Sequence, residues 1–151
     1  MKRILTFIIC LIPWFLSGLI FSSNFDFYES LNKPFFALPK FLFGPVWTIL
    51  YILIAISITI LIFSNYIKYE KEYKKALIFN YIFNQLYLFF IFFLKSPFLG
   101  FIDCVLIFIT GLFLYYETKE LNKKAAYYLL PYVFFNLYAV ILSLSIYFMN
   151  L

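Results

Sequence analysis

The chain has 151 residues, of which 66% are hydrophobic and only 13% are charged. Soluble domains carry about a quarter charged residues, so this chain cannot cover a soluble core and must be solvated by lipid. The net charge of +5 does not indicate a nucleic-acid partner, because the 12 Lys and Arg lie in short segments between long apolar runs.

Five uncharged apolar runs predict five transmembrane helices. Each run has about eighteen residues or more, which at about 1.5 Å per residue reaches roughly 27 Å, close to the hydrocarbon thickness of a bilayer. The first run follows Lys2 and Arg3 but is longer than a signal-peptide core, and no small-residue cleavage site follows it. The sequence predicts an all-α integral membrane protein, a five-helix bundle in a single domain over residues 1–151. Its expected spans are about residues 4–21, 45–64, 76–94, 98–116 and 125–149.

The distribution of basic residues predicts the orientation of these spans. Nine Lys and Arg lie in the segments on the N-terminal side, and three, Lys33, Lys40 and Lys95, lie in the loops on the other side. Positive charge is retained on the cytoplasmic side of a membrane. We therefore expect a multi-pass protein of the bacterial cytoplasmic membrane, with the N-terminus inside and the C-terminus outside.

The loop between the first two spans, about residues 22–44, is long and holds Pro34, Pro39 and six Phe. Connections of this length are usually binding loops or lids when they are ordered, and disordered segments are usually poor in aromatic residues. We therefore expect an ordered lid rather than a flexible linker.

The second span begins with two aromatic residues on one face. Pro45 is expected in the first helical turn, where its missing N–H costs no intrahelical bond. Trp47 and Tyr51 follow it four residues apart, so both side chains project from the same face just below the lid.

The third span carries Asn80 and Asn84 four residues apart, with Gln85 beside them. Polar groups inside a membrane must find partners, so these side chains are expected to face the bundle interior. They either join helices through hydrogen bonds or bind a ligand, and both interpretations remain open for Asn80. The ligand interpretation is favoured for Asn84 and Gln85. The loop that follows this span, Lys95-Ser96-Pro97, is so short that it predicts a tight antiparallel hairpin of the third and fourth spans.

Asp103 is the one formal charge inside the five runs. A carboxylate within a span costs about 2.5 to 3.5 kcal/mol on insertion scales, which indicates a partner or a role. Asp103 is either a structural acid held by hydrogen bonds or a proton-linked group. In the fifth span, Ala139 and Ser143 form a small-xxx-small pair, which serves helix packing within the bundle or a dimer face.

Both cysteines lie in apolar runs without metal-ligand spacing, and the chain has no His. The chain therefore lacks the residues that a zinc site or a His-bound haem iron needs, and it lacks the His of Cys-His or Ser-His catalysis. We expect no metal and no resident cofactor, and we assign no catalytic residue.

The run FYESLNKPFFALPKFLFGPVWTILY, from Phe27 to Tyr51, resembles the signature of the TspO/MBR family, the translocator or tryptophan-rich sensory proteins. The resemblance continues at Asn84-Gln85-Leu86 and at Leu129-Leu130-Pro131-Tyr132. In these motifs the chain is similar to Bacillus-type members of the family. It implies a five-helix bundle, often a homodimer, that binds porphyrins and, in animal members, cholesterol and benzodiazepine-type drugs. By position it implies a ligand pocket made of Tyr28, Trp47, Tyr51, Asn84, Gln85, Phe135 and Ala139.

The chain departs from the family pattern at several aromatic positions. Phe27 and Phe36 replace loop tryptophans, and Phe135 replaces a pocket Trp that the family implicates in light-dependent porphyrin breakdown. Phe lacks the indole N–H and its ease of oxidation. No basic residue follows Tyr147, so the sterol motif of the L/V…Y…K/R type is absent there.

Three functions follow as hypotheses. The leading one is binding of a porphyrin or similar flat hydrophobic molecule, stacked on Trp47 and Phe135, for tetrapyrrole transport, sequestration or stress sensing. The second is light-dependent porphyrin degradation that uses Trp47. The third is proton-coupled export of a small molecule, with Asp103 as the coupling group.

Overall fold

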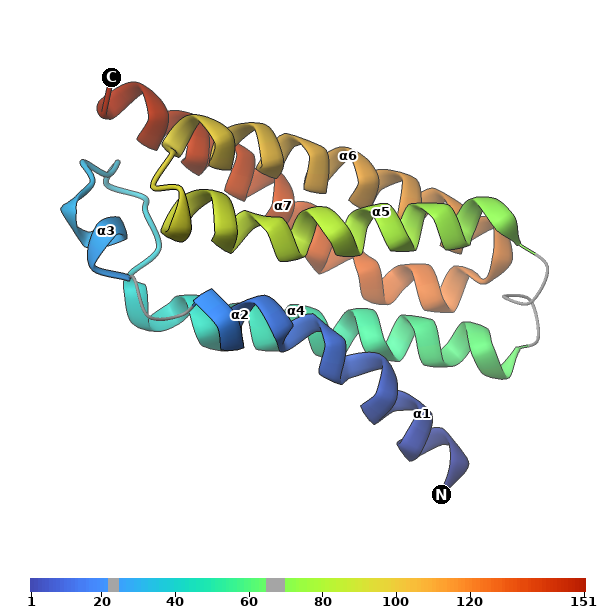
Figure 1. Ribbon diagram of the computed structural model, residues 1–151. Coiled ribbons are helices and arrows are strands. Elements are labelled where there is room, and N and C mark those ends of the chain that lie inside the picture. Colours follow the sequence, from blue (N-terminus) through green and yellow to red (C-terminus); the bar gives the residue numbers. More distant parts are fainter. Residues whose placement is uncertain (22–24, 65–69) are drawn as a thin grey trace.

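The computed structural model describes residues 1–21, 25–64 and 70–151, which fold as a bundle of helices (Figure 1). Within these residues, five helical segments are long and apolar enough to cross a membrane. An odd number of crossings leaves the N- and C-termini at opposite ends of the bundle, as Figure 1 shows. The predicted all-α, five-span membrane fold is therefore confirmed. The segments are Lys2–Phe21, Lys40–Phe63, Lys71–Phe93, Pro97–Leu121 and Lys123–Met149.

The first span is interrupted near its middle. It consists of α1 (Lys2–Leu11), a short 3₁₀ turn η1 (Ile12–Phe15) and α2 (Leu16–Phe21). Pro13 lies in the turn, and a proline cannot donate a backbone hydrogen bond. α1 runs alongside α4 but splays away from the bundle at its N-terminal end, whereas α2 lies against α5 (Figure 1).

Two side chains of α5 (Lys71–Leu88) stabilise this interruption. The Tyr81 hydroxyl donates to the Pro13 carbonyl at 3.1 Å, and Gln85 Oε1 accepts from the Ser17 N–H at 2.8 Å. Water is absent inside a membrane, so backbone groups released by a kink need such partners.

The second span, α4 (Lys40–Phe63), begins five residues before the predicted start. The prediction that Pro45 lies in the first helical turn was wrong, because Pro39 is the N-cap and Pro45 lies inside the helix. Apolar runs mark the part of a helix that crosses lipid, whereas the helix itself continues into the polar boundary. The lid is correspondingly shorter and ends at Pro39. Residues 22–24 of the predicted lid lie outside the described residues.

The third and fourth spans form the predicted tight antiparallel hairpin, and α5 packs along α6 (Pro97–Leu121). α5 ends in a wide π-helical turn, η3 (Phe89–Phe93), after which Lys95 has a φ of 51°. Ser96 then caps α6 by accepting the Leu99 N–H at 3.3 Å. A Cβ on Gly100 would overlap the side chain of Ile91, so glycine permits the close approach of α6 to η3.

The fifth span, α7 (Lys123–Met149), is joined to α6 by a single residue, Asn122. The Asn122 side chain accepts the Ala125 N–H at 3.0 Å, while its own N–H donates to the Thr118 carbonyl at 2.8 Å. So short a connection forces α7 back along α6, and α7 also packs against α4. The four helices α4, α5, α6 and α7 are therefore joined in one bundle, and the first span packs against α4 and α5 with Trp14 in the buried core.

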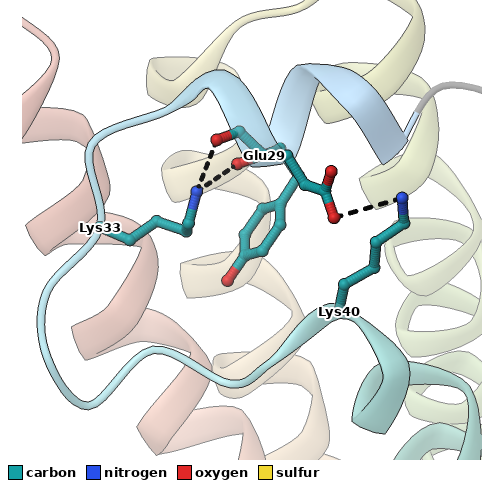
Figure 2. Close-up of polar contacts among 4 residues, drawn as sticks. Glu29, Lys33 and Lys40 are labelled. Carbon is teal, nitrogen blue, oxygen red and sulfur yellow. Dashed lines mark hydrogen bonds and ion pairs between the residues drawn. The ribbon is translucent and has the colours of Figure 1, made fainter.

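The lid is folded over one end of the bundle. It contains a short helix, α3 (Phe25–Ser30), followed by residues 31–39, and α3 lies against η3 (Figure 1). Lys33 Nζ donates to the backbone carbonyls of Tyr28 at 2.8 Å, Glu29 at 3.0 Å and Leu31 at 2.8 Å. Glu29 also pairs with Lys40 at 3.3 Å (Figure 2). This ion pair joins α3, at one end of the lid, to the first residue of α4, at the other end.

The C-terminus holds the lid through a reciprocal pair of hydrogen bonds that we name the lid latch. Asn150 Oδ1 accepts the Asn32 N–H at 2.9 Å, and Asn150 Nδ2 donates to the Asn32 carbonyl at 2.9 Å. The Tyr138 hydroxyl adds a bond to the Phe36 carbonyl at 2.9 Å. Residues more than a hundred positions apart in the chain are therefore joined at this end of the molecule.

Removing the lid latch should release the lid without unfolding the bundle. We expect Asn150→Ala to raise amide hydrogen exchange in residues 31–38 about ten-fold, because it removes two hydrogen bonds that each contribute about 0.5 to 1.5 kcal/mol. The measurement is hydrogen exchange with mass spectrometry in detergent micelles. Ser145→Ala is the control, because that hydroxyl bonds only within its own helix, to the Ile141 carbonyl at 2.8 Å. If hydrogen exchange in Asn150→Ala matches that in the control, the lid latch does not hold the lid in place.

Candidate ligand-binding site

A cavity of about 260 Å³ lies between α2, α4, α5 with η3, and the lid. We name it the main cavity. Its walls are mostly apolar, with a few polar side chains, as is usual for a site that takes a hydrophobic small molecule. The lining residues are Trp14, Phe15, Ser17, Gly18, Tyr28, Phe43, Gly44, Trp47, Thr48, Tyr51, Asn84, Tyr87, Leu88, Ile91 and Phe92.

Three large aromatic side chains form one wall of the main cavity. The ring centroids of Trp47 and Tyr51 are 5.6 Å apart, as their predicted position on one helix face requires. Trp14 also packs against Tyr51, with centroids 5.5 Å apart and ring planes 32° apart. Sequence reasoning missed Trp14. A signal was present, because Trp14, Ser17 and Gly18 share one face of a span that is otherwise largely aliphatic.

The lid closes the main cavity through Tyr28, which is only 7% exposed. Its ring meets Phe43 edge to face at 5.1 Å, and its hydroxyl donates to the Leu38 carbonyl at 3.2 Å. Burial, together with the neighbouring Tyr138, raises the pKa of Tyr28 to about 12. The hydroxyl therefore keeps its proton at neutral pH and remains a donor within the lid.

A chain of hydrogen bonds runs from the main cavity through the bundle. The Tyr51 hydroxyl donates to Asn84 Oδ1 at 2.8 Å, and Asn84 Nδ2 donates to the Tyr132 hydroxyl at 3.1 Å. Tyr132 donates to Asn80 Oδ1 at 2.9 Å, and Asn80 Nδ2 donates to Thr110 Oγ1 at 3.0 Å. We name these five residues the polar chain. It links α4, α5, α7 and α6, so it sets the relative positions of the helices that enclose the core.

The three amides predicted on the third span have different surroundings. Asn84 lines the main cavity, but its oxygen and one of its N–H groups are already bonded within the polar chain. Asn80 is fully buried and joins helices. Gln85 lines neither of the cavities described here and bonds to the interrupted first span. The side chains of Asn80 and Gln85 therefore make hydrogen bonds between helices. The predicted contact of Gln85 with a ligand stays a prediction that neither cavity supports.

Phe135 and Ala139 line a second cavity of about 20 Å³, which we name the small cavity. Three residues, Phe43, Trp47 and Tyr87, line both cavities and form the partition between them. The rings of Trp47 and Phe135 meet edge to face, with centroids 5.5 Å apart. Apart from Gln85, the predicted pocket residues therefore divide between two adjoining cavities.

The small-xxx-small pair of the fifth span faces inward. Ala139 lines the small cavity, and Ser143 is 5% exposed. Of the two roles expected for the pair, its position supports packing within the bundle and not a dimer face.

Asp103 lies on α6 and is 1% exposed, and neither of its carboxylate oxygens has a hydrogen-bond partner among the described residues. It lines neither the main cavity nor the small cavity. Both interpretations from the sequence, a structural acid and a proton-linked group, stay predictions. Within residues 1–21, 25–64 and 70–151, no group of three or more His, Cys, Asp or Glu side chains could hold a metal ion.

Breaking the polar chain at its centre should destabilise the bundle. We expect Tyr132→Phe to lower the free energy of unfolding by about 1 to 2 kcal/mol, because Asn80 Oδ1 and an Asn84 N–H lose their partner without access to water. Unfolding is followed by circular dichroism in mixed micelles. Tyr127→Phe on the same helix is the control, because Tyr127 is 72% exposed. Equal stability of the two variants would show that the chain does not hold the helices together.

Comparison with known proteins gives one family and several relatives. The model of the TspO/MBR family matches residues 5–149. The chain is 36% identical over 137 residues to the tryptophan-rich protein TspO of Bacillus cereus, covering 91% of this chain and 89% of that protein. It is 33% identical over 135 residues to the uncharacterized membrane protein YtaB of Bacillus subtilis, covering 89% and 87%, and 32% identical over 130 residues to the tryptophan-rich protein TspO of Archaeoglobus fulgidus, covering 82% and 79%. With a family match over nearly its whole length, this integral membrane protein belongs to the TspO/MBR family.

Proposed function

We propose that the main cavity binds a flat hydrophobic molecule of the porphyrin or tetrapyrrole class. The observation that carries this proposal is the aromatic wall of Trp14, Tyr51 and Trp47, whose neighbouring ring centroids are 5.5 and 5.6 Å apart. A row of rings offers a flat ligand stacking and edge contacts that an aliphatic wall does not provide.

The size of the main cavity suggests that the lid must move when a large ligand binds. At about 260 Å³ it lies just below the range of about 300 to 1,000 Å³ that is usual for small-molecule sites. A single flat ring system fits this space, whereas a complete tetrapyrrole needs the lid to move outward. Hydrogen bonds at the lid's edge and the contact between Tyr28 and Phe43 are the interactions that such a movement breaks.

The proposal includes the orientation of the site in the membrane. Nine of the 12 Lys and Arg lie on the N-terminal side of the spans, which supports a cytoplasmic N-terminus and an external C-terminus in a bacterial cytoplasmic membrane. The lid and the lid latch then lie on the outer face. A ligand bound beneath them is positioned for transport, sequestration or stress sensing, all of which begin with the binding step.

Binding can be measured through the protein's own fluorescence. The chain has two Trp, and both line the main cavity, so quenching by protoporphyrin reports on this site. We expect Trp47→Ala to weaken binding at least about ten-fold, which corresponds to about 1.4 kcal/mol of lost ring contact. Trp14 remains as the reporter in that variant.

Phe134→Ala is the matched control, because Phe134 lies on α7 beside Phe135 but is 68% exposed toward lipid. It should bind protoporphyrin as the wild type does. If Trp47→Ala has wild-type affinity, or if the wild type shows no saturable quenching, the main cavity is not the porphyrin site.

A second candidate function is light-dependent porphyrin breakdown, and the position of Trp14 favours it. Phe135 replaces the family's second pocket Trp, which argues against this chemistry from the sequence alone. Trp14 nevertheless supplies another indole to the main cavity, and both Trp14 and Trp47 contact Tyr51. Two oxidisable indoles therefore remain beside the space that an illuminated porphyrin would occupy.

This candidate requires turnover and not only binding. We expect the wild type to convert bound protoporphyrin to new absorbing products under illumination in the presence of dioxygen, which serves as the oxidant. Trp14→Phe should bind the porphyrin but form product several-fold more slowly, because Phe is harder to oxidise. Product analysis by absorbance and mass spectrometry, with a dark control, makes the measurement. A product rate equal to that of free porphyrin under the same light would eliminate the enzyme hypothesis.

A further inference from the structure

Asn136 is a buried amide without a hydrogen-bond partner. It lies on α7, is 1% exposed and lines the small cavity. Neither its Oδ1 nor its Nδ2 has a partner among the described residues. Buried amides are nearly always paired, and a membrane interior offers no bulk water to take the place of a partner.

Tyr132, a polar neighbour of Asn136 on α7, makes its hydrogen bonds with Asn80 and Asn84. The single hydroxyl proton of Tyr132, one turn earlier on α7, is already donated to Asn80 Oδ1 at 2.9 Å. On the facing helix is Gly111, where an added Cβ would lie 3.1 Å from Asn136 Nδ2. Asn136 therefore packs against helix backbone whose own groups are used within the helix.

The other amides near the two cavities are already engaged. Asn84 bonds to Tyr51 and Tyr132, Asn80 bonds to Tyr132 and α6, and Gln85 bonds to the first span. Asn136 is therefore the amide on the lining of the described cavities in which neither the oxygen nor the nitrogen has a partner among the described residues. A polar group on a bound ligand would find its free amide partner here.

The small cavity has the size for such a group. At about 20 Å³ it exceeds the roughly 10 to 15 Å³ that one water molecule requires, so a single carbonyl or hydroxyl oxygen fits. The partition of Phe43, Trp47 and Tyr87 separates it from the main cavity. Because these three side chains line both cavities, a ring held against Trp47 lies next to the small cavity, and its substituent reaches Asn136 when one of the three side chains moves aside.

We propose that Asn136 binds a carbonyl or hydroxyl substituent of a ligand whose flat ring occupies the main cavity. This inference rests on the proposed binding of flat hydrophobic molecules, and it names the ligand class more closely. The amide of Asn136 donates a hydrogen bond to the ring-edge oxygen, so the site selects flat aromatic ketones and related oxygenated rings over the corresponding hydrocarbons. Asn136 is a specificity-determining residue, whereas Trp47 and its neighbours hold the ring.

The test uses two rigid probes that differ in one group. Fluorenone carries a ring-edge carbonyl, and fluorene has a methylene at the same position. Dissociation constants of both are measured by tryptophan quenching for the wild type and for Asn136→Leu, in the same micelles. For each protein we take the ratio of the fluorenone constant to the fluorene constant. Because the two probes partition into the micelles equally for both proteins, this partitioning cancels when the two ratios are compared.

We expect Asn136→Leu to bind fluorene as the wild type does and to lose about ten-fold of the preference for fluorenone. In the wild type the carbonyl stretch of bound fluorenone should move to lower wavenumber, as a hydrogen-bonded ketone requires, and it should return in the variant. Ser57→Ala is the matched control, because Ser57 is another buried, unpartnered polar side chain that lines neither cavity. It should leave both the ratio and the infrared band unchanged.

Three results would overturn the inference. An unchanged ratio in Asn136→Leu, with fluorene still bound, removes Asn136 from ligand recognition but leaves the proposed ring site intact. An unshifted carbonyl band in the wild type does the same, and it requires no variant to fold. Failure of the wild type to bind fluorene would remove both the ring site and the role of Asn136. Asn136→Ala provides a second variant, in which the amide is removed without a larger side chain, and the same loss of preference is expected.

Discussion

The rest of the structure depends on the need to pair polar groups where no water is available. The polar chain meets this need by passing one hydrogen bond after another from Tyr51 to Thr110 across four helices. Apolar contacts alone discriminate poorly between one rotation of a helix and another in lipid, because tails and side chains are equally apolar. Directional bonds between α4, α5, α6 and α7 fix these rotations, and with them the wall of Trp47 and Tyr51.

The same requirement positions the outer span. Pro13 interrupts the first span, and Tyr81 and Gln85 bond to the backbone groups around the interruption. These contacts hold Trp14 against Tyr51 and complete the aromatic wall. α5 therefore uses one face for the core and an adjacent one for the first span, and the main cavity lies between the two.

A buried polar group that lacks a hydrogen-bond partner lowers the stability of the bundle at that position. Asp103 and Asn136 are both buried, with side-chain atoms that lack a partner among the described residues, but of these two Asn136 alone lines the main or the small cavity. An unpaired group beside a space large enough for a ligand oxygen has a physical use, because binding supplies the missing bond. Asp103 has no such space beside it among the described cavities, so its position separates it from the ligand chemistry proposed here.

The sequence by itself determined the helical membrane fold, because hydropathy over about eighteen residues must match the bilayer and no other backbone pairs all its groups in lipid. It also determined the pairing of Trp47 with Tyr51, which needs only helical spacing. Helix ends were less predictable, because α4 continues past its apolar run to Lys40. Only the tertiary structure decided which amides were free for a ligand. Asn84, Gln85 and Asn136 have the same functional group, and their partners come from other helices whose rotation about their axes no local pattern specifies.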